Sequence, residues 1–184
     1  MTGVQTCALP IYGFGYIIPA TFLPAMAREL LGDPAVFGLA WPLFGAAAVV
    51  STLAAGALLR VAGNRRLWAA SHCLMAAGAA LPVFVPGLAA ILFSALAVGG
   101  TFMVATMCAI REARAVAGDR ATGLIAAVTA AFALGQLLGP VLVASLSLAG
   151  LADPYPPALL LAALLLVASG WELAQRPAPK PPGE

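Results

Sequence analysis

Residues 56–68 read GALLRVAGNRRLW, a short basic segment that separates two long apolar runs. The runs, at about 37–59 and 67–85, are each close to the length of about 20 apolar residues that a membrane-spanning helix needs. A basic turn between two such runs is typical of a membrane hairpin whose turn stays in water. The stretch therefore predicts two membrane helices joined by a tight, positively charged connection.

The composition of the whole chain points the same way. Hydrophobic residues make up 62% of the 184 residues, charged residues make up 9%, and the mean hydropathy is +1.01. A soluble domain is about 45–50% apolar and about 25% charged. The chain is therefore predicted to be an integral membrane protein. Its net charge of +2 gives no reason to expect nucleic acid as a partner.

Six apolar runs are long enough to cross a bilayer. They cover about 12–27, 37–59, 67–85, 88–110, 122–148 and 157–173. They are apolar on every side, whereas the strands of a membrane barrel alternate over about 10 residues. The sequence predicts an all-α polytopic membrane protein, with a six-helix bundle over 12–174 and a disordered Pro-rich tail over 175–184.

The basic residues predict an orientation. With the start of the first helix in the cytoplasm, eight of the nine Lys and Arg residues fall on the cytoplasmic side: Arg60, Arg65, Arg66, Arg111, Arg114, Arg120, Arg176 and Lys180. Only Arg28 falls on the other side. Cytoplasmic loops carry an excess of Lys and Arg, so both ends of the six-helix segment are expected in the cytoplasm.

The basic segment resembles the cytoplasmic loop motif of the major facilitator superfamily, G-x3-D-R-x-G-R-R, which recurs in weaker form between helices eight and nine. Gly56, Gly63 and Arg66 match the motif and Arg65 keeps its basic character, but Arg60 stands where the family has its acidic residue. That departure suits the weaker second copy and casts doubt on a charge relay here. The alternative is an ordinary basic loop, a glycine turn beside anionic headgroups.

A second motif lies on the fifth predicted helix, in AFALGQLLGPVL at residues 131–142. Gly135 and Gly139 form a small-xxx-small pair that lets helices approach closely. Pro140 removes a helical hydrogen bond and bends the helix. The pattern is similar to the G-x3-G-P sequence of the superfamily's fifth and eleventh helices.

Together the motifs resemble helices seven to twelve of that superfamily, the C-terminal half of a twelve-helix transporter. The segments GFGYIIPATFLPAMAR at 13–28 and GGTFMVATM at 99–107 are closest to its YbfB/YjiJ-type branch. The resemblance implies a fragment of a secondary transporter that moves a small solute across the bacterial inner membrane by alternating access. Its partners would be the solute, the bilayer and a missing N-terminal six-helix half, without cofactor or metal.

The first eleven residues, MTGVQTCALPI, do not look like the start of a membrane helix, because their polar residues are scattered and show no periodicity. They also do not fit a secretory signal, because they lack the Lys or Arg of its basic first region. Codons for residues 2–11 can be written so that they reproduce one frame of a common short-read sequencing adapter. We expect residues 1–11 to be a non-native segment fused to a truncated gene.

In the resembling family, the solute path is lined by the first, second, fourth and fifth helices of this half, near the bilayer midplane. Polar and aromatic residues on these helices are the path candidates: Gln136, Phe132, Thr129, Tyr16, Phe14, Thr21 and Thr101. The first three share a helix face at spacings of three and four residues. Alternatively, Gln136 bonds a neighbouring helix and the threonines bond their own backbone.

Functions other than transport have less support in the sequence. A membrane enzyme such as an intramembrane serine protease needs a nucleophile and a base within reach, and His72, the only histidine, has no evident serine partner in the sequence. A channel would want rings of polar residues, and an assembly subunit leaves no sequence signal. No Asp or Glu lies in the middle of a predicted span, and the three cysteines lack metal-site spacing. We expect no enzyme.

Overall fold

In a computed structural model of the chain, residues 3–31 and 38–175 are described, and they form six α-helices. The helices are α1 (Gly3–Leu31), α3 (Ala40–Ala62), α4 (Asn64–Phe84), α5 (Leu88–Ala117), α6 (Ala121–Leu148) and α7 (Tyr155–Gln175), with the 3-10 turn η1 (Gly118–Arg120) before α6. These residues contain no strand. The predicted all-α class is confirmed, while most of the expected disordered tail lies outside the described residues.

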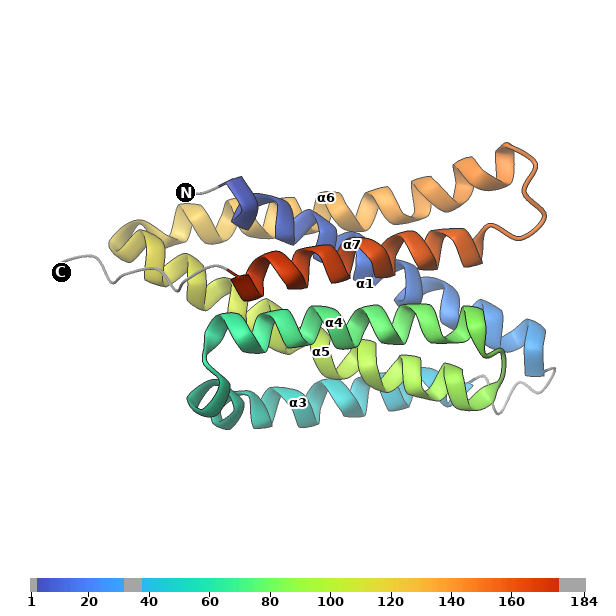
Figure 1. Cartoon of the computed structure of the whole chain (residues 1–184), viewed down its shortest axis with the longest axis horizontal. Coiled ribbons are helices and arrows are strands. Elements are labelled where there is room, and N and C mark those ends of the chain that lie inside the picture. The colour runs from blue at the N-terminus through green and yellow to red at the C-terminus, as the bar shows by residue number, and fades with distance from the viewer. Residues whose placement is uncertain (1–2, 32–37, 176–184) are drawn as a thin grey trace.

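Successive helices run back and forth along one long axis (Figure 1). The α3–α4 and α5–α6 turns lie at the end of the molecule that also holds the start of α1 and the end of α7, and the α4–α5 and α6–α7 turns lie at the opposite end. The α3–α4 turn is a single residue, Gly63, whose φ of 74° lies in the left-handed region that favours glycine.

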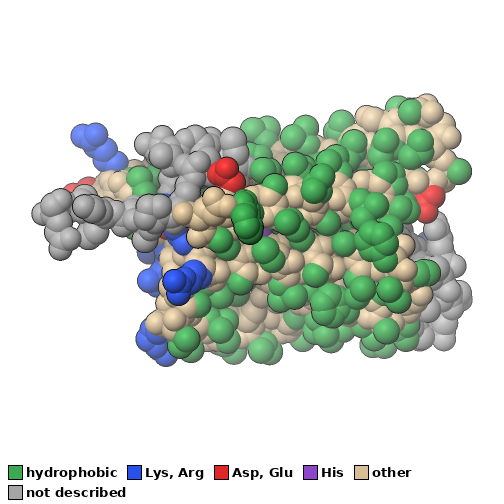
Figure 2. Space-filling view, in the orientation of Figure 1, with side chains coloured by type: hydrophobic (Ala, Val, Ile, Leu, Met, Phe, Trp, Pro, Cys, Tyr) green, Lys and Arg blue, Asp and Glu red, His purple; other side chains and the backbone are tan. Residues whose placement is uncertain are grey.

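By length and hydropathy, four helical stretches of the described residues can cross a membrane: Ala40–Ala62, Asn64–Phe84, Leu88–Leu148 and Tyr155–Gln175. The third is 61 residues long because it holds both α5 and α6, and Ala8–Phe22 is a shorter apolar helix. Hydrophobic side chains cover the length of the molecule, while most Arg side chains of the described residues gather at one end (Figure 2). The protein is therefore a multi-pass membrane protein.

Two helices extend beyond the apolar runs from which they were predicted. Helix α5 continues to Ala117 instead of ending near residue 110, because the added segment REARAVA is rich in strong helix formers. Helix α1 begins at Gly3 and thus includes most of the segment 1–11. Both extensions lie at the basic end of the molecule.

The helices differ in how deeply they are packed. Helix α4 lies between α5 and α7, and α1 packs mainly along α6 and α7. Helix α3 is peripheral, since it packs almost only against α5 and its buried residues are Ala40 and Ala55. The core therefore lies among α1, α4, α5 and α7, whereas α3 and α6, at opposite edges of the bundle, are less covered (Figure 1).

Candidate functional site

Four aromatic rings from four different helices meet around Tyr16 of α1. The Tyr16 ring stacks on Phe102 of α5 with 4.4 Å between centroids, and it lies 6.1 Å from Phe132 of α6 and 6.2 Å from Phe44 of α3. All four side chains are half-buried. We call these residues the Tyr16 cluster. Tyr16 and Phe102 lie near the middle of their helices, so the cluster lies near the mid-length of the bundle.

The Tyr16 cluster rests on a fully buried tyrosine, Tyr12, one turn earlier on α1. The Tyr12 ring stacks on Phe132 at 5.0 Å and on His72 at 5.6 Å. Its hydroxyl donates to the backbone carbonyl of Phe102 and lies 3.1 Å from the Thr106 hydroxyl. These contacts fix the rings beneath the cluster and tie α1 to α5.

Two polar side chains at the cluster have no hydrogen-bond partner within the described part of the chain. One is the hydroxyl of Tyr16, and the other is the amide of Gln136. Gln136 lies one turn beyond Phe132 on the same face of α6 and is half-buried. The structure thus brings Tyr16 and Phe132 together, with Gln136 beside them along α6.

The remaining path candidates do not join the cluster. The hydroxyl of Thr129 donates to the backbone carbonyl of Ile125 at 2.9 Å, and the hydroxyl of Thr101 donates to the backbone carbonyl of Ala97 at 2.6 Å. Both threonines therefore bond their own helices, the alternative that the sequence left open. Thr21 is exposed and Phe14 is buried in the core.

Sequence reasoning missed Phe44, Phe102 and Tyr12 as members or supports of the site. Tyr12 and Tyr16 are four residues apart, a spacing that places them on one helix face. That signal was available in the sequence. Phe44 and Phe102 have no comparable signal, because only the folded bundle brings α3 and α5 to Tyr16.

The glycine motif of α6 packs against α1. A Cβ atom on Gly135 would lie 2.1 Å from the Pro10 carbonyl oxygen, and one on Gly139 would lie 2.4 Å from the Ile17 side chain. The same contact continues at Gly13, where a Cβ would lie 2.2 Å from the Phe132 carbonyl oxygen. Glycine is therefore required on both helices. Pro140, next to Gly139, is exposed.

The basic segment 56–68 contacts α5 near the C-terminal end of that helix through an ion pair and hydrogen bonds. Arg65 donates from Nε to Oε1 of Glu112 at 2.7 Å, and its Nη2 lies 2.5 Å from the same oxygen. Asn64 donates to Oε2 of Glu112 at 3.0 Å. Arg60 and Arg66 are exposed, and a Cβ on Gly56 would meet nothing within 4 Å. Of the loop motif, only Arg65 and the turn residue Gly63 thus have a defined structural role here.

Comparison with known proteins decides what kind of bundle this is. The profile of the family described as "Uncharacterised MFS-type transporter YbfB" matches residues 2–173. The chain belongs to this family. Searches of curated proteins and of solved structures each returned no match. Family membership makes the chain a transporter of the major facilitator type, with a small-molecule substrate and a membrane location.

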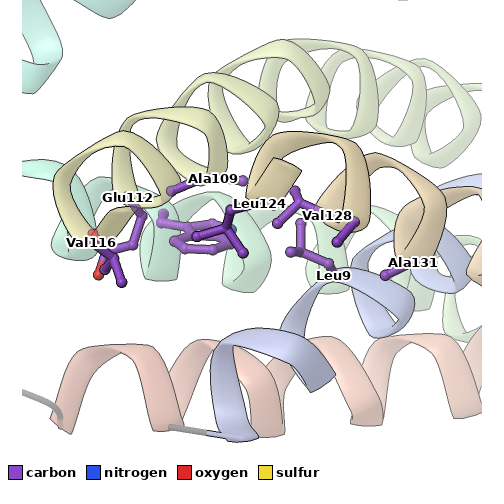
Figure 3. A pocket seen from close by; sticks show the side chains of 10 residues that line it. Leu9, Ala109, Glu112, Val116, Leu124, Val128 and Ala131 are labelled. Atoms are coloured by element: carbon purple, nitrogen blue, oxygen red, sulfur yellow. The ribbon is translucent and has the colours of Figure 1, made fainter. Parts of the chain in front are cut away.

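In this MFS-type chain, a cavity lies near the basic end, bounded by Trp68 of α4 and by side chains of α1, α5 and α6. Figure 3 shows Glu112 and Val116 of α5 with Leu124 and Val128 of α6 around it. Its volume is about 50 Å³, and its walls are almost entirely apolar. Ligand pockets usually measure about 300–1,000 Å³, so this cavity is too small to hold a transported solute.

His72 does have a serine partner, contrary to our expectation from the sequence. Its Nδ1 lies 3.1 Å from Ser169 Oγ on α7, and its Nε2 accepts a hydrogen bond from Trp68 Nε1 at 3.1 Å. Because Nε2 is the acceptor, the proton of the neutral ring sits on Nδ1 and is donated to Ser169. In this tautomer His72 does not take the serine proton, and both side chains are buried.

Proposed function

We propose that the chain is the C-terminal half of a secondary active transporter that moves a small solute across the bacterial inner membrane by alternating access. The match to the YbfB-type family over residues 2–173 carries this proposal. Six helices that alternate in direction would form one six-span half of a major facilitator bundle. Transport would then need a second, N-terminal six-helix half.

We further propose that all six helices cross the membrane, with the basic end in the cytoplasm. Exposed Arg60, Arg66, Arg111 and Arg114 border the α3–α4 and α5–α6 turns, and Asp153 lies beside the opposite α6–α7 turn. The positive-inside rule assigns the first end to the cytoplasm. Both ends of the native segment would then be cytoplasmic.

The solute path would run along the Tyr16 cluster. Its four rings come from α1, α3, α5 and α6, which are the helices that the family resemblance assigns to the path. The cluster is half-buried rather than enclosed. This is the geometry expected if a second half supplies the opposite wall, because transporter sites lie at the interface of repeats near the bilayer midplane.

The orientation can be tested by cysteine labelling. In a chain whose three native cysteines are replaced by alanine, single cysteines are placed at Arg60, Asp119, Pro86 and Asp153. A membrane-impermeant maleimide added to inside-out vesicles should label the first two positions, and added to spheroplasts it should label the last two. Labelling of all four positions from one side would contradict six crossings.

The truncation can be tested in the genome of the source organism. We expect the native reading frame to continue upstream of the codon for Tyr12 into six further apolar helices, in place of residues 1–11. A chromosomal copy that encodes TGVQTCALPI in frame would contradict the adapter origin. In proteoliposomes, residues 12–184 alone should accumulate no solute, and uptake without a second half would contradict the half-transporter proposal.

We propose no enzymatic function. The buried Ser169–His72 contact is the feature that most nearly suggests one, but its proton lies on the wrong nitrogen for a general base. In the assembled transporter, Ser169→Ala should therefore leave uptake unchanged. Loss of uptake without loss of folded protein would show that the Ser169 hydroxyl takes part in transport.

A further inference from the structure

We infer that the Tyr16 cluster binds a flat aromatic solute that carries a hydrogen-bonding group and no negative charge. This inference names the solute class for the proposed path and rests on the proposed function. It is carried by three observations: the four converging rings, the two polar side chains without partners, and the lack of cationic residues at this depth.

The rings provide surfaces for stacking. Tyr12, which belongs to the core below, is 1% exposed, whereas Tyr16, Phe44, Phe102 and Phe132 all keep exposed surface. Aromatic rings attract one another in offset or tilted arrangements with centroids about 4.5–7 Å apart, beyond what area burial alone contributes. A planar ring that lies on the cluster can make the same contacts.

The polar groups provide orientation. The Tyr16 hydroxyl can donate or accept, and the Gln136 amide can do both. Neither bonds another described residue, although a half-buried polar group in a membrane bundle normally finds a partner. Their position beside exposed ring surface points to a partner outside the chain. A hydroxyl or amide on the solute would satisfy them.

Charge excludes one class of solute. Among the described residues, the Arg side chains of α1, α3 and α5 lie in the last turns of these helices, at Arg28, Arg60, Arg111 and Arg114, and α6 has none. An anion at the depth of Tyr16 would therefore find no counter-charge on the described residues of these helices, which is costly in a low-dielectric site. Neutral aromatic solutes meet no such penalty.

The test is photolabelling of the 184-residue chain in lipid nanodiscs with 4-azidophenol, followed by mass-spectrometric mapping. We expect labels on peptides that contain Tyr16, Phe102 or Phe132. An excess of 2-naphthol should reduce this labelling at least fivefold, while decahydro-2-naphthol, which is similar in size but saturated, and 2-naphthalenesulfonate should not. Tyr16→Ala should reduce labelling to a similar degree. Trp171→Ala, which removes an exposed aromatic ring from α7, is the matched control and should not.

Labelling spread evenly over exposed helix faces, or equal competition by the saturated and aromatic alcohols, would overturn the inference. Equal labelling of Tyr16→Ala and Trp171→Ala would do the same. Binding is measured here without transport, so its failure leaves the half-transporter proposal to the vesicle and genome experiments. If labelling is specific but the cysteine-labelling experiment contradicts six crossings, the proposed function is contradicted while the binding site at the Tyr16 cluster is still supported.

Discussion

Two groups of polar and aromatic side chains, one buried and one half-buried, lie on either side of Tyr12, and they differ in how completely their hydrogen bonds are satisfied. On one side, Trp68, His72 and Ser169 form a closed chain that joins α4 to α7, with each contact at 3.1 Å. On the other side, the Tyr16 hydroxyl and the Gln136 amide have no partner within the described residues. The first group is a structural support, and the second is the candidate solute site that we propose.

The difference shows why residue type alone misleads in a membrane chain. A lone histidine in a span suggests proton transfer, yet His72 is 0% exposed and both its ring nitrogens are engaged. A second proton would set two N–H donors against each other at Nε2. The features that distinguish the proposed site are partial exposure and the lack of hydrogen-bond partners among the described residues, and neither can be read from a sequence.

The largest expected effect comes from adding a methyl group to the close contact between α1 and α6. Gly13→Ala would place a Cβ 2.2 Å from the Phe132 backbone oxygen, and since backbone cannot move aside as a flexible side chain can, we expect a loss of about 3 kcal/mol in the free energy of unfolding. SDS titration in mixed micelles measures this. Gly56→Ala, where nothing lies within 4 Å, is the control. Equal stability of the two variants would show that α1 and α6 are not in contact.

The next largest effect is expected in the Trp68–His72–Ser169 chain. His72→Leu would leave the Trp68 N–H and the Ser169 hydroxyl without their partner, so we expect a loss of about 2 kcal/mol by the same titration. Ser169→Ala removes only one hydrogen bond and should cost about 1 kcal/mol. If His72→Leu were neutral, the group would not be a structural support.

A smaller effect is expected at the basic end. Glu112→Gln removes the charge that Arg65 contacts, and the two side chains are 6% and 15% exposed. Because the pair is largely shielded from water, we expect a loss of about 1–2 kcal/mol. Arg66→Gln, which alters the neighbouring exposed arginine, should change stability by less than about 0.5 kcal/mol. Equal losses would mean that the Arg65–Glu112 contact contributes nothing.

The smallest effect on stability is expected at the Tyr16 cluster and Gln136. Tyr16→Phe and Gln136→Leu remove polar groups that bond no other described residue, so each should change the unfolding free energy by less than about 0.5 kcal/mol. Each should nevertheless weaken labelling by 4-azidophenol. A large loss of stability in either variant would show that the polar group has a structural partner and would remove the contrast with His72.

Much of this arrangement could be predicted from the sequence. The apolar runs predicted the helices, and Gly135 and Gly139 marked a close helix contact. The sequence did not predict that α1 makes this contact, because a pair of small residues indicates close packing with some helix but does not identify which one. The Arg65–Glu112 pair was also missed, since the two residues lie 47 positions apart and meet only when α4 packs on α5.

The most direct test is one ¹⁵N–¹H NMR spectrum of the chain in nanodiscs, recorded before and after addition of 2-naphthol. The spectrum reports on both sides of the comparison at once, through the side-chain amide of Gln136 and the indole N–H of Trp68, which Gln136→Leu and Trp68→Phe assign. We predict that the Gln136 amide signals shift with saturation while the Trp68 signal stays in place. A shift at Trp68 alone, or equal small shifts at both, would contradict the distinction between a closed support and an open solute site.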